Sequence, residues 1–434
     1  MARKPYQALR HRDYALLATA NLVSLTGSQM QVVAINWHVY LLTGSALKLG
    51  LVGLTRVIPI ILFSLWGGVA ADRFDRRKVM FVAQVVMTLV ATAFAVITFS
   101  RHESLWLIYL LSALSAAATA FDNPARQALI PRLVPREELP AAMAMNLTFF
   151  NIAFIGGPAL AGLLIAGTGA GLHPSALALH RTGAPGDPRG LWWIYALNAV
   201  SFLGVIVSLI IMRTSGKVAP GEGREHPGFV TSLRDGLKFV ASVPVMVWTM
   251  GLDFFATFFA GAMSLLPIFA DKILGASAVG YGWLVSAPAL GALLGSLYTS
   301  LYPLPKKQGR VILWAVAGYG AATIVFGLSR IYWLTFVALA ATGLCDAVST
   351  VIRQTLRQML TPDALRGRMT AVNMIFFMGG PQLGEFEAGL VASLFAAVAT
   401  GAMVSVVAGG VATLVVAGLI AGLTPVVRNY EPAA

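Results

Sequence analysis

Long apolar runs alternate with short polar turns along the whole chain. Each run can supply the roughly 20 helical residues that cross a bilayer, and none has the ten-residue alternation of an outer-membrane barrel strand. The runs cover residues 14–42, 46–71, 79–99, 105–128, 141–166, 191–212, 244–270, 277–302, 311–329, 332–356, 368–396 and 401–425. This pattern predicts an all-α membrane protein with twelve transmembrane helices.

The longest polar interruption, residues 213–243, separates the first six runs from the last six. Its first part, 216–228, has the composition of a flexible linker, whereas 229–240 can form an amphipathic helix on the membrane surface. We therefore expect three parts: an N-terminal six-helix bundle at 1–212, a cytoplasmic linker at 213–243, and a C-terminal six-helix bundle at 244–434.

The two halves are related by an internal repeat. An offset of 227 residues places Arg126 on Arg353, Pro135 on Pro362, Asn146 on Asn373, Phe149 and Phe150 on Phe376 and Phe377, and Gly162 on Gly389. The repeat predicts two six-helix bundles related by pseudo-twofold symmetry. In such transporters the substrate site lies near the membrane midplane between the halves, and one half rocks against the other.

Composition agrees with a membrane protein. Hydrophobic residues make up 57% of the chain and charged residues only 11%, and the mean hydropathy is +0.76. A soluble protein of this size needs about 25% charged residues to cover its surface. These values exclude a soluble globular enzyme and make the lipid bilayer the first expected partner.

The net charge of +13 follows from topology, so no nucleic-acid partner is expected. Of the 31 lysines and arginines, 24 fall in the termini and turns on one side of the predicted membrane and six on the other. Because cytoplasmic loops carry the excess of cations, both termini are predicted to be cytoplasmic. For a bacterial protein, the expected location is the cytoplasmic (inner) membrane.

Motifs for other chemistry are missing from the sequence. Gly216-Lys217 lacks the remainder of a phosphate-binding loop, the six histidines have no metal-ligand spacing, and the single Cys345 excludes an intrachain disulfide. We expect no cofactor, no metal and no enzymatic activity. The chain is also expected to act as a monomer.

The most charged stretch, Gly67 to Lys78, lies between the second and third runs; we call it the basic turn. Its Gly68, Asp72, Arg73, Arg76 and Arg77 match a motif in which glycine, acid and cations follow the second helix, and Asp75 replaces a second glycine. With the twelve runs and the repeat, the chain resembles the major facilitator superfamily over essentially its whole length.

This resemblance implies a gate at the basic turn. Gly68 would let the second helix approach a neighbour, and Asp72 would accept hydrogen bonds from the start of the eleventh helix near Arg366 and Arg368, where the helix dipole favours an anion. The arginines of the motif would reach other cytoplasmic helix ends. The simpler alternative is a positively charged anchor that only fixes topology.

The fifth run contains Gly157, Pro158 and Gly162, which are similar to the motif of proton-coupled drug antiporters. Together with Thr43-Gly44-Ser45-Ala46 and Asn123-Pro124-Ala125-Arg126, this stretch resembles the drug:proton antiporter subgroup that includes multidrug exporters and the enterobactin exporter. One difference is that 105–121 has no basic residue, although most antiporters have an arginine midway along this helix.

Acidic residues inside apolar runs are candidates for proton coupling, because charge at bilayer depth costs about 2.5–3.5 kcal/mol and is retained for function. The candidates are Asp253, Glu385, Glu387, Asp122 and Asp346. Asp122 and Asp346 have a structural alternative, pairing with Arg126 and Arg353 on the same helices. For the others the alternative is a hydrogen bond in helix packing. Asp253 is expected on a helix face with Phe254 and Phe258.

Amides and aromatic residues inside the runs are candidates for lining a substrate cavity, where a few polar groups orient the ligand among aromatic walls. They are Gln31, Asn36, Trp37, His38, Asn146, Asn151, Phe254 and Phe258. Hydrogen bonding between helices is the alternative for each amide, and His38 is more typical of a packed histidine than of a proton relay.

These patterns predict a secondary active transporter that exports small amphipathic or lipophilic molecules in exchange for protons. A dedicated exporter of a siderophore or another metabolite is the first alternative, and a nutrient importer is the second. A membrane enzyme would need a cluster of catalytic residues at one membrane face. A receptor would usually carry a soluble domain, but the longest polar stretch has only about 30 residues.

Overall fold

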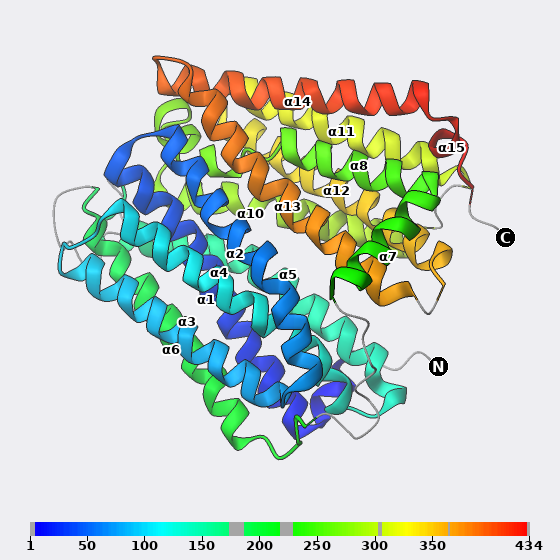
Figure 1. Cartoon of the computed structure of the whole chain (residues 1–434). Helices are drawn as coiled ribbons and strands as arrows, with labels where there is room; N and C mark the ends of the chain where they lie inside the picture. Colours follow the sequence, from blue (N-terminus) through cyan, green and yellow to red (C-terminus); the bar gives the residue numbers. More distant parts are fainter. Residues whose placement is uncertain (1–4, 173–185, 218–228, 303–305, 363–364, 432–434) are drawn as a thin grey trace. The chain divides into compact units, whose positions relative to one another are not determined.

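The computed structural model describes residues 5–172, 186–217, 229–302, 306–362 and 365–431 (Figure 1). Within this part the chain divides into two compact units. Unit 1 contains residues 1–43, 55–225 and 277–282, and unit 2 contains residues 44–54, 226–276 and 283–434. Each unit thus includes a short segment from a helix whose remainder belongs to the other. The predicted division at 1–212, 213–243 and 244–434 stays a prediction.

The long helices of the first half match the first six apolar runs. They are α1 (Arg12–Thr43), α2 (Ala46–Arg73), α3 (Arg76–Phe99), α4 (Leu105–Leu129), α5 (Leu139–Gly167) and α6 (Trp192–Ile211). Short 3-10 helices connect them, namely η1 (Pro5–Arg10), η2 (Ile130–Arg132), η3 (Arg136–Glu138) and η4 (Pro188–Leu191).

The second half begins with α7 (Phe229–Ser242), which occupies the segment predicted to be an amphipathic helix. Residues 218–228 of the predicted linker lie outside the described residues. The apolar Phe239 and Val240 of α7 pack into the core of unit 2. The six long helices that follow are α8 (Pro244–Phe259), α10 (Ala278–Leu301), α11 (Gln308–Leu328), α12 (Tyr332–Leu360), α13 (Arg366–Ser393) and α14 (Val398–Leu423), and the short α15 (Pro425–Arg428) ends the described elements.

The seventh apolar run is the one interrupted long helix among the described residues. After α8 ends at Phe259, the chain continues through η5 (Met263–Leu265), α9 (Leu266–Ile268) and the π-helical η6 (Phe269–Ile273). The Ser264 hydroxyl in this break donates to the Glu385 carbonyl oxygen of α13 at 3.2 Å. The expectation of a single continuous helix over 244–270 is therefore wrong, although the whole stretch remains long and apolar enough to cross a membrane.

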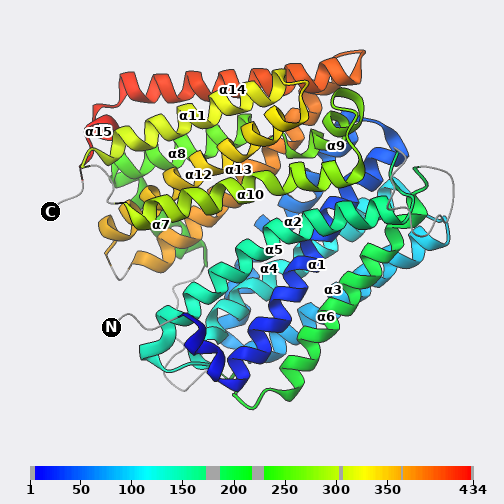
Figure 2. The same ribbon diagram turned by 180° about the vertical axis from the view of Figure 1, so that it is seen from behind.

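Helix packing repeats between the units, as the 227-residue offset predicts. In unit 1, α3 packs on α4 and α6, and α1 packs on α5 and α6. In unit 2, α11 packs on α12 and α14, and α8 packs on α13 and α14. Figure 1 shows α11 beside α14, and Figure 2 shows α3 beside α6. Thus α1, α3 and α4 correspond to α8, α11 and α12.

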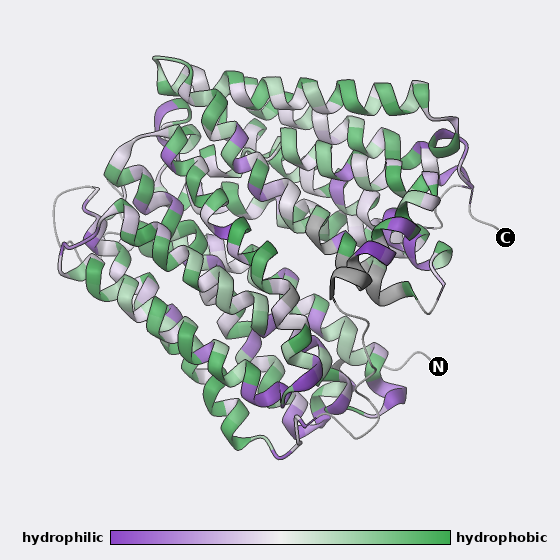
Figure 3. Cartoon of the chain, viewed as in Figure 1, coloured by the Kyte–Doolittle hydropathy of each residue, from purple (hydrophilic) through white to green (hydrophobic). Residues whose placement is uncertain are grey.

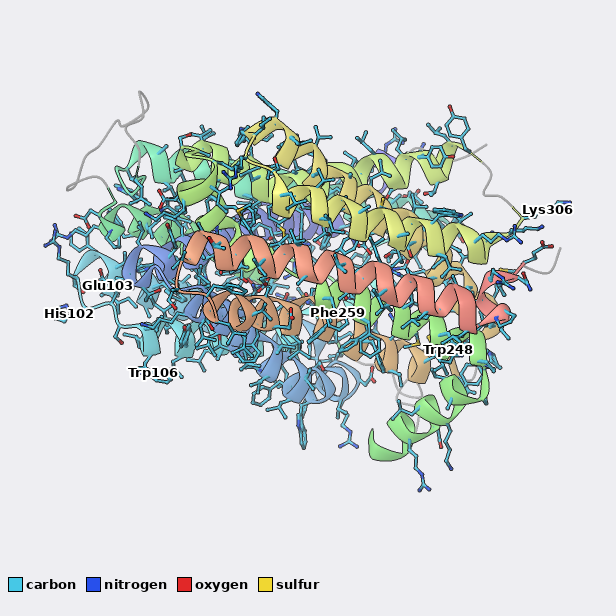
Figure 4. All side chains as sticks on the ribbon, turned by 90° about the horizontal axis from the view of Figure 1, so that it is seen from above. His102, Glu103, Trp106, Trp248, Phe259 and Lys306 are labelled. Atoms are coloured by element: carbon cyan, nitrogen blue, oxygen red, sulfur yellow. The ribbon has the colours of Figure 1, made fainter. Side chains whose placement is uncertain are left out.

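The outward helix faces are apolar, and in Figure 3 the long helices are coloured mainly as hydrophobic. Ten helical segments of the described chain are long and apolar enough to span a membrane. With α1 and α13, of 32 and 28 residues, they make up the twelve predicted helices. Exposed tryptophans mark helix ends in the way that aromatic belts do at bilayer interfaces. In Figure 4, Trp106 lies beside His102 and Glu103 at the α3–α4 turn, and Trp248 lies toward the Lys306 end of unit 2.

Candidate functional site

The basic turn connects the ends of four helices in unit 1. The Asp75 carboxylate accepts a hydrogen bond from the Arg77 backbone N–H at 3.0 Å and so caps the start of α3. Arg76 donates to the carbonyl oxygens of Ala71 on α2 and Ala128 on α4, each at 3.3 Å. Arg77 donates to the Ile210 carbonyl oxygen on α6 at 3.0 Å. These cations lie where the C-terminal ends of helix dipoles favour positive charge.

The glycines of the basic turn differ in their surroundings. A Cβ atom on Gly67 would lie 2.1 Å from the Ala120 carbonyl oxygen of α4, so Gly67 makes the close helix approach. Around Gly68 no described atom lies within 4 Å of that position. Asp72 is exposed and takes part in an interaction. The side chains of Arg366 and Arg368 lie outside the described residues, so the gate contact between Asp72 and the start of α13 stays a prediction.

A partly buried arginine of α4, Arg126, organises the polar cluster of unit 1. Arg126 forms an ion pair with Asp122, four residues earlier on the same helix, and donates to the Asn21 side-chain oxygen on α1. The Gln84 amide of α3 donates to the other Asp122 oxygen at 3.0 Å. Arg126 also borders a small pocket with Tyr14 and Asn146. We call this group the Arg126 site.

The repeat places a second arginine, the fully buried Arg353 on α12, at the matching position of unit 2. Its Nη2 atom lies 2.7 Å from Asp253 on α8 and 3.5 Å from Asp346 on its own helix. The Nη1 atom donates to the Ser349 hydroxyl at 2.9 Å, and Nη2 donates to the Thr350 hydroxyl at 2.8 Å. Arg353, the two acids and Ser349 border a small pocket that is also lined by Tyr319 and Cys345. We call this group the Arg353 site.

We expected Asp253 to share a helix face with Phe254 and Phe258, but in the structure it does not. It faces the pocket together with Ala256 and Thr257, because residues three or four apart lie on one side of a helix. The rings of Phe254 and Phe258 stack on each other at 6.0 Å between centroids. Phe254 also meets Phe376 of α13 edge-on at 5.8 Å, so an aromatic cluster joins α8 and α13.

The antiporter-like motif of α5 permits close packing. A Cβ atom on Gly157 would lie 2.9 Å from the Thr26 carbonyl oxygen of α1, and one on Gly162 would lie 2.6 Å from the Ala278 carbonyl oxygen of α10. Both contacts lie within unit 1. Pro158 is buried inside α5. In this structure the motif is a packing surface where backbones approach each other closely.

Glu385 and Glu387 are half-buried on α13. Glu385 lies beside Gly53 of α2 within unit 2, since a Cβ atom on Gly53 would be 3.0 Å from a Glu385 carboxylate oxygen. Gly50 packs in the same way against the Glu385 backbone, since a Cβ atom on Gly50 would be 2.8 Å from the Glu385 carbonyl oxygen. The two glutamates are two residues apart and therefore project from different sides of the helix.

Several cavity candidates are packed between helices in this structure. Gln31 accepts a hydrogen bond from the Asn198 amide of α6 at 2.7 Å. The Trp37 indole donates to the Ala170 carbonyl oxygen at 3.0 Å, and its ring stacks on Tyr281. His38 is buried beside the Tyr195 hydroxyl at 3.1 Å. Asn36 is also buried, whereas Asn146 and Asn151 are half-buried.

One acid outside the apolar runs ties two helix ends together. Asp13, at the start of α1, accepts hydrogen bonds from the Arg213 and Thr214 backbone N–H groups at 3.0 and 2.7 Å, and from the Thr214 hydroxyl at 2.6 Å. Burial opposes the charged carboxylate, but the hydrogen bonds outweigh it, and the pKa of Asp13 lies below its ordinary value. We call this contact the Asp13 clasp.

The sequence interpretation gave Arg353 as a possible partner of Asp346 but missed its contact with Asp253 on α8. It also missed Gln84 and Asn21 as members of polar clusters. The 227-residue repeat was a usable signal for Arg353, because it places this arginine on Arg126. Nothing in the sequence relates Gln84 or Asn21 to Asp122 and Arg126, since these contacts depend on how three helices are rotated. Among the described residues, no group of three histidine, cysteine or acidic side chains could hold a metal ion.

Comparison with known proteins agrees with this architecture. A solved bacterial homologue of the human lysosomal transporter Spinster, in an inward-facing and occupied conformation, has a TM-score of 0.73 at 16% identity and covers 98% of this chain and 99% of its own. The nucleoside transporter NupG has a TM-score of 0.68 at 12% identity, covering 95% and 99%. At these identities the likeness establishes the fold.

Sequence relatives are found among curated exporters. The enterobactin exporter EntS of Escherichia coli O1:K1 / APEC is 26% identical over 393 residues, which are 90% of this chain and 88% of that protein. EntS of Shigella boydii serotype 18 matches with the same identity and coverage. The model of the family described as "Transmembrane secretion effector" matches residues 3–179 and 188–432. The chain therefore belongs to this family and is a multi-pass membrane transporter of the major facilitator superfamily, not an enzyme.

Proposed function

We propose that this transporter exports small amphipathic or lipophilic compounds from a bacterial cytoplasm in exchange for protons, by alternating access. The observation that carries the proposal is the pair of carboxylate–arginine clusters inside apolar helices, one in each unit. Ionised groups at bilayer depth are costly and mark ion or substrate pathways. The names of the curated relatives support the outward direction of transport.

Proton coupling is assigned to the acids inside the long helices, Asp253, Glu385, Glu387, Asp122 and Asp346. Each can lose its charge by taking up a proton when it is removed from water, and release that proton when water returns. Alternating access exposes a group to the two sides of the membrane in turn. A titrating acid on this route can therefore exchange protons for substrate.

A lipophilic substrate is supported by the aromatic cluster of Phe254, Phe258 and Phe376. Aromatic rings supply apolar contact area without demanding one chemistry. The half-buried amides Asn146 and Asn151 are the remaining candidates for orienting a ligand. Gln31, Asn36, Trp37 and His38 would have to leave their packed positions to contact it.

A dedicated siderophore exporter is the second candidate, and the relatives favour it because both are named enterobactin exporters. The two candidates differ in selectivity. A multidrug exporter should accelerate the movement of several unrelated lipophilic dyes. A siderophore exporter should move a catecholate siderophore and leave dyes at the background rate.

The decisive experiment uses the purified full-length protein in lipid vesicles with an imposed pH gradient. We would follow ethidium, a second lipophilic dye and enterobactin, each with the gradient intact and after its collapse by an ionophore. Proton-coupled export requires that accumulation depends on the gradient and is absent from protein-free vesicles. Accumulation that survives the collapse would reject exchange with protons.

The basic turn is proposed to act as the gate, with Asp72 accepting hydrogen bonds at a helix start in one conformation. Asp72→Asn should slow transport in the vesicle assay while expression and thermal stability stay unchanged. The matched control is Glu137→Gln, because Glu137 is an exposed acid on a short turn that the predicted topology places on the same membrane side. Equal transport rates for Asp72→Asn and the wild type would contradict the gate.

Topology completes the proposal. Both termini are assigned to the cytoplasm of a cell whose inner membrane holds the protein as a monomer. A reporter that is active only in the cytoplasm, fused to either terminus, should be active. Light scattering of the protein in detergent should give the mass of one chain, and a reporter inactive at both ends would invert the orientation.

A further inference from the structure

The Arg353 site holds two carboxylates beside one guanidinium group. Asp253 comes from α8, whereas Asp346 and Arg353 both come from α12. Arg353 is only 2% exposed, so its charge depends on these partners rather than on water. One buried carboxylate and one partly exposed carboxylate next to a single positive charge leave an excess negative charge, which is costly in a site that is largely removed from water.

The hydrogen bonds of Arg353 distinguish the two acids. Its Nη2 atom carries two hydrogens, and two acceptors lie close to it, the Asp253 carboxylate at 2.7 Å and the Thr350 hydroxyl at 2.8 Å. Asp346 is 3.5 Å from Nη2, beyond good hydrogen-bond distance. Asp346 also accepts a hydrogen bond from the Thr350 hydroxyl, but that bond is 3.4 Å long. Asp253 is therefore the bound counter-ion, and Asp346 is the weakly held acid.

Solvent exposure also distinguishes the two acids, and Asp346 is the more accessible one. Asp346 exposes 43% of its side chain, and Asp253 exposes 9%. Both border the same small pocket, which has room for about one water molecule. Water can thus reach Asp346 and exchange a proton with it, while Asp253 stays covered by its arginine.

The other titratable or charged groups around Asp346 come from two helices. Tyr319 of α11 and Cys345 of α12 border the pocket. Arg357 lies one turn after Arg353 and donates to the Asn373 side chain on α13, so an amide rather than an acid holds it. The neighbouring helices α10 and α14 carry no acidic or basic residue in their described parts. Among the described residues, the contacts of Asp346 with Arg353 and Thr350 are both long.

We propose that Asp346 carries the proton in this transporter, with Asp253 and Arg353 as a fixed ion pair beside it; the inference rests on the proposed proton exchange. When Asp346 is protonated, the remaining charges of the site are the Asp253 carboxylate and the Arg353 guanidinium, which balance each other. The site can then be closed off from water. When water enters, Asp346 releases its proton. Arg353 stands between the acids where a metal ion would have to bind, which favours a proton over sodium as the coupling ion.

The first test needs no substrate. Infrared difference spectra of the full-length protein in lipid, recorded between alkaline and acidic pH, should show a protonated-carboxyl band that Asp346→Asn removes. Asp253→Asn should keep the band but move its midpoint to lower pH, because Arg353 then turns to Asp346 and stabilises its charge. The control Glu137→Gln, an exposed acid outside the long helices, should leave the band unchanged. A band that persists in Asp346→Asn, or disappears in Glu137→Gln, overturns the assignment.

The second test uses ethidium in vesicles. Asp346→Asn should lose accumulation driven by the pH gradient but retain equilibration of the dye without a gradient, because that movement needs no proton. Gradient-driven accumulation at the wild-type rate in Asp346→Asn overturns the inference. A wild-type protein that ignores the pH gradient rejects the proposed function instead, and the infrared band then still decides whether Asp346 titrates.

Discussion

The Arg126 and Arg353 sites occupy matching positions of a repeated fold, yet they join their helices in different ways. In unit 1 the acid is on the arginine's own helix, and an amide, Asn21, makes the contact to α1. In unit 2 a carboxylate, Asp253, makes the contact to α8, the counterpart of α1. Only unit 2 therefore has a charge–charge contact between two helices at this position. The duplicated scaffold has been kept, whereas its electrostatics have diverged.

The largest expected effect comes from removing each arginine. Arg353→Ala leaves Asp253 buried and without its counter-ion, which costs about 3–5 kcal/mol in comparable buried pairs. Arg126→Ala should cost less, about 1–3 kcal/mol, because Asp122 keeps the hydrogen bond from Gln84. Thermal unfolding of the two variants in the same detergent measures the difference. Equal losses would show that the two sites hold their helices equally.

Neutral double variants sharpen the same comparison. Asp253→Asn combined with Arg353→Gln removes both charges of the Asp253–Arg353 pair, so it should recover most of the stability that Arg353→Gln alone loses, a coupling of about 2 kcal/mol. Asp122→Asn combined with Arg126→Gln should show a coupling below about 1 kcal/mol, because that pair lies on one helix. A double-mutant cycle on unfolding temperatures gives both values. A larger coupling energy for Asp122 and Arg126 than for Asp253 and Arg353 would contradict the conclusion that the unit 2 pair is the stronger one.

The Gln84 amide is the feature of unit 1 that limits the loss at Asp122. Gln84→Leu removes a buried hydrogen bond to a charged group and should cost about 1.5–3 kcal/mol. The matched control is Thr88→Ala on the same helix, since the Thr88 hydroxyl donates to the Gln84 backbone carbonyl oxygen within α3. This change should alter stability by no more than about 0.5 kcal/mol. The combination of Gln84→Leu with Arg126→Ala should then lower the folding stability by as much as Arg353→Ala does.

The Asp13 clasp gives the smallest effect and lies outside both arginine sites. Asp13→Ala should lower stability by about 1 kcal/mol at neutral pH. Because the folded-state pKa of Asp13 is lowered, its contribution is fully present above the unfolded value of about 3.9 and is lost as pH falls through the folded value. Unfolding temperatures of wild type and variant should therefore converge only at acidic pH. Convergence near neutral pH would mean that the carboxylate's charge is not what holds the clasp.

The sequence predicted most of the fold, because apolar runs of bilayer length have few alternatives. Helix α4 begins at Leu105 as expected and ends one residue beyond the predicted Ala128. The break after Phe259 was not predictable, since hydropathy reports the environment of side chains and is insensitive to the backbone path. A run that stays apolar through Gly261 and Ala262 gives no warning that its helix stops.

The candidate site was predictable only where partners are close in sequence. The spacing of Asp122 and Arg126 places them one turn apart, so their pairing could be anticipated from the chain alone. Asp253 and Arg353 are 100 residues apart, and their contact depends on the rotation of α8 and α12 about their axes. The placement of Asp253 with Phe254 and Phe258 was avoidable, because the spacing of four residues already puts Asp253 and Thr257 on one side of the helix.

The hydrogen bonds of the basic turn have a mechanical consequence for unit 1. Arg76 and Arg77 clamp the last turns of α2, α4 and α6 to the start of α3. A helix fastened in this way cannot swing as a separate flap, so any displacement at this end must carry all four helices together. The basic turn therefore couples the four helices, so that a force on one helix tilts the whole bundle.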